Sequence, residues 1–187
     1  MLSRGGAKAQ RQKGPPRRRK APGPVRPAAP SPAEALARRL VDALCDPDEP
    51  RRQANTRHVL RTCLPAAVAL VCRLLVERLL AGPLEGRRSA RASLVQFGAA
   101  AAPAVYCRLL GASGAGTQLA LVEALAAIGA GLPVRDRVER MLDLAIVRGR
   151  AAGGAVVEAI DAAIATLRRL NERDARSGQS PAGAACR

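Results

Sequence analysis

The side chains best able to act as nucleophiles, bases or metal ligands are few in this chain of 187 residues. It contains one histidine, His58, and five cysteines, which are Cys45, Cys63, Cys72, Cys107 and Cys186. A helix would place His58 and Cys63 on different sides, and no carboxylate has helical spacing to His58. The cysteines form no Cys-x-x-Cys pair. The sequence therefore predicts no catalytic residue, no metal site and no cofactor, and it places His58 on the surface.

A glycine-rich segment, residues 111–117, has the two glycine positions of a phosphate-binding loop. Thr117 stands where such a loop needs lysine, and the residues before it have a helical rather than a strand pattern. We therefore predict a turn in which Thr117 caps the next helix.

Three carboxylates, Asp136, Glu139 and Asp143, are close enough in sequence to suggest acid–base chemistry. Helix pairing is the plainer interpretation, because Asp136 and Arg140 have the favourable acid-first spacing of four residues. Asp143 and Asp161 lie in otherwise apolar stretches, so they are the carboxylates that we expect to be partly buried. These patterns favour a protein that is not an enzyme.

Positive charge gathers in two blocks of the chain, whose formal net charge is +16. Residues 1–33 hold nine basic and no acidic residues, and residues 51–91 hold nine basic and two acidic residues. The candidate binding residues in these blocks are Arg17, Arg18, Arg19, Lys20, Arg52, Arg57, Arg61, Arg87, Arg88 and Arg91. In the first block they suggest an electrostatic tether to nucleic acid, a targeting signal or a plain solubilising tail. A general Ala and Arg bias of the genome is the bland explanation for both blocks.

Proline and glycine divide the rest of the chain into helices. The predicted helices span residues 32–45, 51–62, 65–81, 87–98, 102–111, 117–129, 134–148 and 153–171. The first opens on a capping box formed by Ser31 and Glu34, and it places Leu36, Leu40, Val41 and Leu44 on one buried side. No stretch alternates with a period of two, so the fold class is all-α. Residues 31–172 are the predicted domain, between disordered tails at 1–30 and 173–187.

Short motifs recur along this helical region. Cys72-Arg73-Leu74-Leu75 returns 35 residues later as Cys107-Arg108-Leu109-Leu110, and residues 94–98 return in character 31 residues later as residues 125–129. The pattern resembles the short, lyase-like form of the HEAT-type helical repeat, which Leu94, Phe97, Gly98, Ala101, Pro103 and Val105 match. The resemblance implies a short α-solenoid of about three helical hairpins between cap helices. A compact helical bundle is the alternative.

The resemblance implies a binding function, because such repeats are known mainly as scaffolds. Some similar proteins are DNA glycosylases whose sites set an acidic residue beside tryptophan, and this chain has no Trp. We therefore expect a scaffold or adaptor that binds another protein through one repeat face. The alternative is a protein that binds the nucleic-acid backbone through the basic tail and a ridge of stacked arginines. We expect the cysteines to be reduced, and we find neither a signal-peptide core nor a membrane span in the sequence. Together these features suggest a cytoplasmic location.

Overall fold

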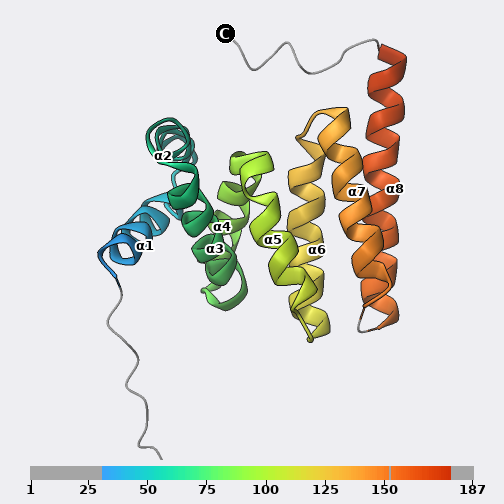
Figure 1. Ribbon diagram of the computed structural model, residues 1–187, viewed down its shortest axis with the longest axis horizontal. Helices are drawn as coiled ribbons and strands as arrows, with labels where there is room; N and C mark the ends of the chain where they lie inside the picture. The colour runs from blue at the N-terminus through green and yellow to red at the C-terminus, as the bar shows by residue number, and fades with distance from the viewer. Residues whose placement is uncertain (1–30, 152, 178–187) are drawn as a thin grey trace, which may run out of the picture.

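The computed structural model describes residues 31–151 and 153–177. Within those residues the chain forms eight α-helices, one 3₁₀ turn and no strand, so the predicted all-α class is confirmed (Figure 1). The elements are α1 (Pro32–Leu44), α2 (Glu49–Thr62), α3 (Pro65–Ala81), α4 (Leu84–Phe97), η1 (Gly98–Ala100), α5 (Ala102–Leu110), α6 (Ala115–Ala130), α7 (Val134–Arg148) and α8 (Gly154–Ser177). The predicted tail at 1–30, with Arg17, Arg18, Arg19 and Lys20, lies outside the described residues, as do residues 178–187.

Most helix ends lie within one residue of the prediction, but α2, α4 and α6 begin two or three residues earlier than predicted. The backbone N–H of Glu34 donates to the Ser31 hydroxyl oxygen at 3.2 Å, which is one half of the predicted capping box. The Glu34 carboxylate instead pairs with Arg38 at 2.8 Å. Proline stands in the first turn of α1, α2, α3 and α5, where its missing N–H costs no helical hydrogen bond.

Two local predictions are wrong. Leu36 is 60% exposed because the side of α1 that packs inward carries Ala37, Val41 and Leu44 instead. Thr117 is not a cap, because α6 begins at Ala115 and Gly114 is its N-cap residue.

The predicted end of the last helix is also wrong, since α8 ends at Ser177 rather than at residue 171. Arg137 on α7 explains the extension. Its guanidinium donates to the Asn171 side-chain oxygen at 2.9 Å and to the Asp174 carboxylate at 2.9 Å. These contacts hold the last turns of α8 against the start of α7.

Successive helices alternate between two layers (Figure 1). In the odd layer α1, α3, α5 and α7 contact one another in order, and in the even layer α2, α4, α6 and α8 do the same. The first residues of α2, α4 and α6 are Glu49, Leu84 and Ala115, so their separations are 35 and 31 residues. Each layer therefore advances by one helix for every helix pair of the chain.

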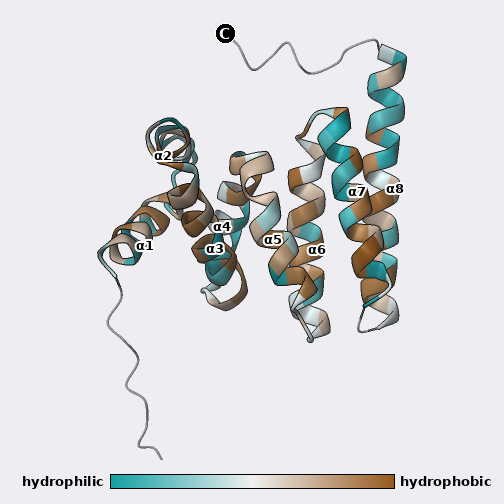
Figure 2. Ribbon diagram, in the orientation of Figure 1, coloured by the Kyte–Doolittle hydropathy of each residue, from teal (hydrophilic) through white to brown (hydrophobic). Residues whose placement is uncertain are grey.

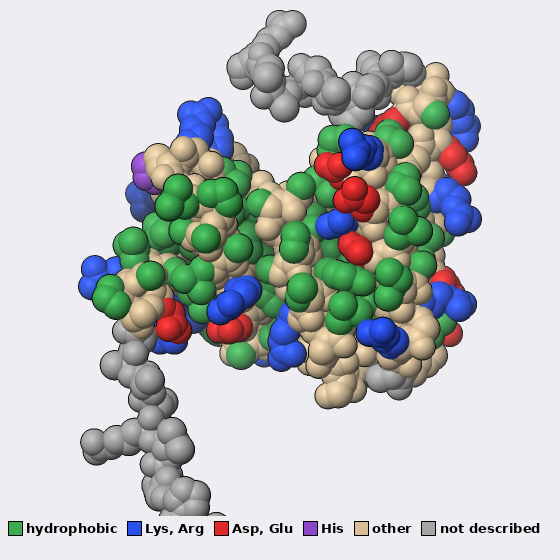
Figure 3. Space-filling view, viewed as in Figure 1, with side chains coloured by type: hydrophobic (Ala, Val, Ile, Leu, Met, Phe, Trp, Pro, Cys, Tyr) green, Lys and Arg blue, Asp and Glu red, His purple; other side chains and the backbone are tan. Residues whose placement is uncertain are grey.

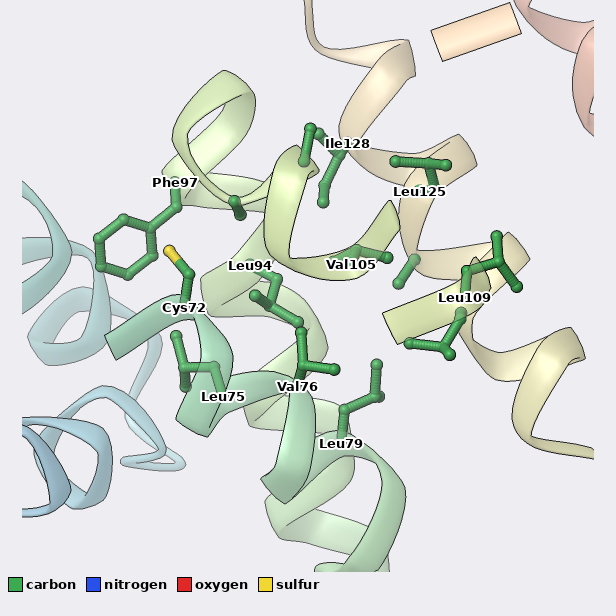
Figure 4. Close-up of a cluster of buried hydrophobic side chains, with 14 of the residues drawn as sticks. Cys72, Leu75, Val76, Leu79, Leu94, Phe97, Val105, Leu109, Leu125 and Ile128 are labelled. Carbon is green, nitrogen blue, oxygen red and sulfur yellow. The ribbon is translucent and has the colours of Figure 1, made fainter. Parts of the chain in front are cut away.

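The core lies between the two layers and runs through the whole stack. Figure 4 shows its central part, where side chains of α3 and α5 meet those of α4 and α6. Among them Leu75, Leu94 and Leu125 are fully buried. Burying each such leucine stabilises the fold by about 2 kcal/mol relative to an exposed one. Because no helix pair can cover its own apolar sides, each pair needs a neighbour.

Among the described residues, no single helix is both long and apolar enough to cross a membrane. Leu84–Ala100 and Ala102–Leu110, which meet at an angle of 107°, reach that length and apolarity only as a bent pair.

Candidate functional site

The arginines predicted to form a ridge have different surroundings in the structure. Arg57, Arg61 and Arg88 are exposed and have no carboxylate partner among the described residues. Arg91 instead pairs with Glu123 of α6 at 2.9 Å.

The ridge prediction is wrong for Arg52, because this residue is buried, with only 8% exposed. Arg52 and Arg87 are equivalent, each being the fourth residue of its helix, but both reach back to a loop carbonyl. Four helices share this arrangement, and in each the fourth residue donates to a carbonyl five or six residues earlier. The pairs are Arg52 with Asp46 at 3.0 Å, Arg87 with Gly82 at 2.6 Å, Gln118 with Ala112 at 2.8 Å and Arg137 with Leu132 at 2.8 Å. Arg52 and Arg87 thus occupy equivalent positions because each donates a hydrogen bond to a loop carbonyl that has no partner within a helix.

Most carboxylates of α7 and α8 form ion pairs. Arg140 lies 3.2 Å from Glu139 and 3.1 Å from Asp143, and the predicted pair with Asp136 is not formed. Asp143 is half-buried as expected, and burial raises the pKa of its carboxyl. The expectation that Asp161 is partly buried is wrong, because it lies on the exposed side of α8, where Arg148 reaches it. The hydrogen bonds from Arg148, at 2.7 and 3.0 Å, lower the pKa of the Asp161 carboxyl. Arg148 joins the end of α7 to α8 through these bonds.

No group of three or more His, Cys, Asp or Glu side chains in the described part of the chain could hold a metal ion. His58 is exposed, as predicted.

The described cysteines are free thiols with unequal burial. Cys72 is fully buried against Leu75 and Phe97, and this burial raises its pKa to about 12 (Figure 4). Cys107, its equivalent in the repeated Cys-Arg-Leu-Leu motif, is exposed. The two equivalent thiols therefore differ because neighbouring helices cover only one of them.

We expect the buried thiol to make folding less favourable at high pH. The folded chain keeps the Cys72 proton that the unfolded thiol releases above pH 9, so the free energy of unfolding falls between pH 9 and 12. Urea unfolding at pH 8 and 10.5 should show a decline that is about 2 kcal/mol steeper for the wild type than for Cys72→Ala. Cys107→Ala is the control and should keep the wild-type decline. An equal decline in Cys72→Ala would contradict the assignment.

A groove between α3 and α5 has a volume of about 510 Å³. We call it the α3–α5 groove. Its lining residues are Ala69, Arg73, Val76, Glu77, Ala100, Pro103, Ala104, Cys107 and Arg108. Ala69 of α3, Ala100 of η1 and Ala104 of α5 leave space there, and we call this apolar part of the lining its floor.

Two arginines border this groove from opposite helices. Arg73 is on α3 and Arg108 is on α5, at the same position of the repeated motif. Both are exposed, and neither has a carboxylate within 4.0 Å among the described residues. Glu77 is the single acidic residue of the lining. The groove thus combines an apolar floor with unpaired positive charge at its border.

The hollow continues from the α3–α5 groove toward α2. A neighbouring cavity of about 330 Å³ shares Ala69 and Ala100 with the groove and is lined also by Leu60. Leu60 borders a further cavity that Arg57 lines. That further cavity lies between α2 and α4 and shares no lining residue with the α3–α5 groove, so Arg57 is not part of the groove.

A row of exposed apolar side chains also runs along α7. Its members are Val134, Val138, Leu142 and Ile146, which are 37%, 41%, 60% and 51% exposed. Their spacing of four residues places them on one side of the helix, and Figure 2 shows hydrophobic and hydrophilic bands on α7. Figure 3 shows hydrophobic side chains spread across this face of the molecule, from α3 over α5 to α7.

The sequence reasoning missed the arginines of the groove, although it contained their signal. The Cys-Arg-Leu-Leu repeat was interpreted only as evidence for the fold, yet a repeated exposed arginine on neighbouring helices predicts two charges on one face. The apolar floor had no such signal, because alanines are frequent throughout the chain.

No protein-family model matches this chain, and searches of curated proteins and of solved structures find no match. The HEAT-type resemblance therefore stays a prediction from the motifs. What the geometry itself defines is an all-helical, two-layered domain with an apolar groove between two helices of one layer.

Proposed function

We propose that this protein is a non-enzymatic adaptor of the HEAT-like, α-solenoid type, which binds another protein through the odd-layer face. The order of contacts supports the stacked arrangement, because each helix contacts the helix two places further along the chain. The separations of 35 and 31 residues between equivalent helix starts support tandem repeats rather than a compact bundle.

The α3–α5 groove is the observation that carries this function. A protein-binding surface needs an apolar pocket that excludes water, together with polar groups that orient the partner. The groove offers both, since its floor is built from alanines and its border carries Arg73 and Arg108. Arginine is also among the residues enriched at interfaces.

We expect the partner to contact more of the odd-layer face than the groove alone. A stable complex buries about 800 Å² on each partner. The α7 row and the continuation toward Leu60 extend the apolar surface on both sides of the groove. We therefore expect the partner to cover α3, α5 and α7 together.

Filling the groove should abolish capture of the partner. Ala69 is exposed and lines both the groove and its continuation, so Ala69→Glu adds bulk and charge without disturbing the core. We expect affinity purification of the full chain from its native host to lose its specific partner in this variant, by about tenfold or more. The measurement is quantitative mass spectrometry of the captured proteins.

Ala162→Glu is the matched control, since Ala162 is exposed on α8 in the other layer. It should retain every partner that the wild type captures. If both variants capture the same proteins in the same amounts, the odd-layer face is not the binding site.

Nucleic-acid binding is the second candidate, because Arg57, Arg61 and Arg88 are exposed and have no carboxylate partner among the described residues. Such binding would use phosphates and lose affinity steeply as salt rises. A salt titration with unrelated duplex DNA is therefore the second arm of the same experiment. Steep loss that disappears when residues 1–30 are deleted would favour the nucleic-acid function over the adaptor.

A further inference from the structure

We propose that the segment which occupies the α3–α5 groove is an acidic amphipathic helix of the partner protein. Its apolar side chains fill the groove, and its carboxylates pair with Arg73 and Arg108. The inference rests on the adaptor function proposed above and adds the chemistry of the partner.

Charge complementarity is the first argument. The charged residues that line the groove are Arg73, Arg108 and the single carboxylate Glu77, so positive charge is in excess there. Some other arginines of this fold are paired with carboxylates: Arg91 pairs with Glu123, and Arg148 binds Asp161 through two hydrogen bonds. The two groove arginines have none within 4.0 Å among the described residues, so a partner's carboxylates would meet unpaired guanidinium groups.

The shape of the groove is the second argument. Ala69, Arg73 and Glu77 line it at intervals of four residues, so it follows α3 for about 12 Å, at 1.5 Å per residue. An amphipathic helix presents apolar residues at the same intervals and lies in such a groove as a third helix. The alanine floor leaves room for leucine-sized side chains of this third helix.

The apolar floor also distinguishes a protein segment from a nucleic-acid backbone. Phosphates would use the arginines but leave the alanines and Val76 without a contact. Bases would need aromatic side chains on which to stack, and the chain has only one Phe and one Tyr. Of the described residues, Phe97 is buried in the core and Tyr106 is half-buried.

The test measures the charge preference of the groove in the full chain. The probes are three fluorescent peptides of about 18 residues, long enough to form a helix, with the same leucine and alanine side and with Glu, Gln or Lys on the polar side. By fluorescence anisotropy we expect the Glu peptide to bind about tenfold more tightly than the Gln peptide, and the Lys peptide to bind most weakly.

Charge reversal at the groove should invert this order. In the double variant Arg73→Glu/Arg108→Glu, the Glu peptide should lose about tenfold in affinity and the Lys peptide should gain. Arg168→Glu/Arg173→Glu is the matched control, because both residues are exposed on α8 and the net charge changes equally. It should leave all three affinities within about twofold, since distant surface charges are screened by salt.

Three outcomes would overturn the inference. The first is equal binding of the Glu and Gln peptides; if Ala69→Glu abolishes that binding, the adaptor function stands and only the acidic partner is wrong. The second is an equal loss in the groove and control reversals, which would assign the attraction to overall charge. The third is displacement of the Glu peptide by unrelated duplex DNA that depends on Arg73 and Arg108, which would assign the groove to phosphate recognition. Failure of the adaptor function itself would be a separate result, in which Ala69→Glu captures the same proteins as the wild type.

Discussion

Arg137→Ala should lower the free energy of unfolding by about 3 kcal/mol, the largest effect that we expect of a single substitution. The side chain is 4% exposed and makes four hydrogen bonds. Two of them go to the Leu132 carbonyl, at 3.2 and 2.8 Å, and the others join Asn171 and Asp174. Alanine would leave a buried carbonyl and a mostly buried carboxylate without their donor, and both would then lack compensation for their lost hydration.

Thermal unfolding followed by circular dichroism would measure this effect as a Tm lower by about 6–12 °C. The end of α8 should also loosen first, because Asn171 and Asp174 lose their contact with α7. Hydrogen exchange would detect this as faster exchange near residue 174. Arg135→Ala is the control, since Arg135 is exposed on the same helix, and it should change Tm by less than about 2 °C. A similar small change in Arg137→Ala would contradict the role given to the network.

Gly98→Ala should destabilise the fold by about 2 kcal/mol. Gly98 ends α4 with φ 56° and ψ −127°, and it is the one described residue with positive φ. A side chain there strains the backbone. The nearest atom to an added Cβ would be Leu132 Cδ2 at 3.6 Å, an ordinary contact. The cost is therefore conformational, and the surrounding packing cannot relieve it by a small shift.

We expect Gly116→Ala, in contrast, not to lower the free energy of unfolding. Gly116 lies in the first turn of α6, and nothing stands within 4 Å of an added Cβ. Alanine favours helix over glycine by up to about 1 kcal/mol, so this variant should be as stable as the wild type or slightly more so. In urea unfolding, the free energy of unfolding should therefore fall in Gly98→Ala and stay unchanged or rise slightly in Gly116→Ala. Equal stability of Gly98→Ala and the wild type would show that the turn after α4 tolerates a side chain.

The helical class and many of the helix ends could be predicted because they depend on short-range signals. Pro65 opens α3 and Gly82 ends it, and the bounds of α3 and α7 agree with the prediction. The end of α8 could not be predicted in this way, because Asp174 is held by Arg137, which lies 37 residues away in sequence. A charged, polar ending looks like a frayed tail until its partner is known.

The candidate site, too, could be predicted only in part from the sequence. The repeated Cys-Arg-Leu-Leu motif made Arg73 and Arg108 recognisable as equivalent, but their sequence spacing does not show which side chains remain exposed. Arg52 and Arg87 are also equivalent, and the fold uses both to bind loop carbonyls. Sequence spacing places arginines on matching positions, and only the neighbouring loops and helices decide which of them face solvent.

The sequence alone determined that this protein is helical, that proline and glycine lie at the helix boundaries and that arginine is in excess. These properties depend on residue types and on residues close together in the chain. Only the tertiary structure decided which arginines are buried, where α8 ends and where an apolar groove opens. The physical reason is that burial and charge pairing depend on neighbours from distant helices, and α3 and α5 come together only when the layers stack.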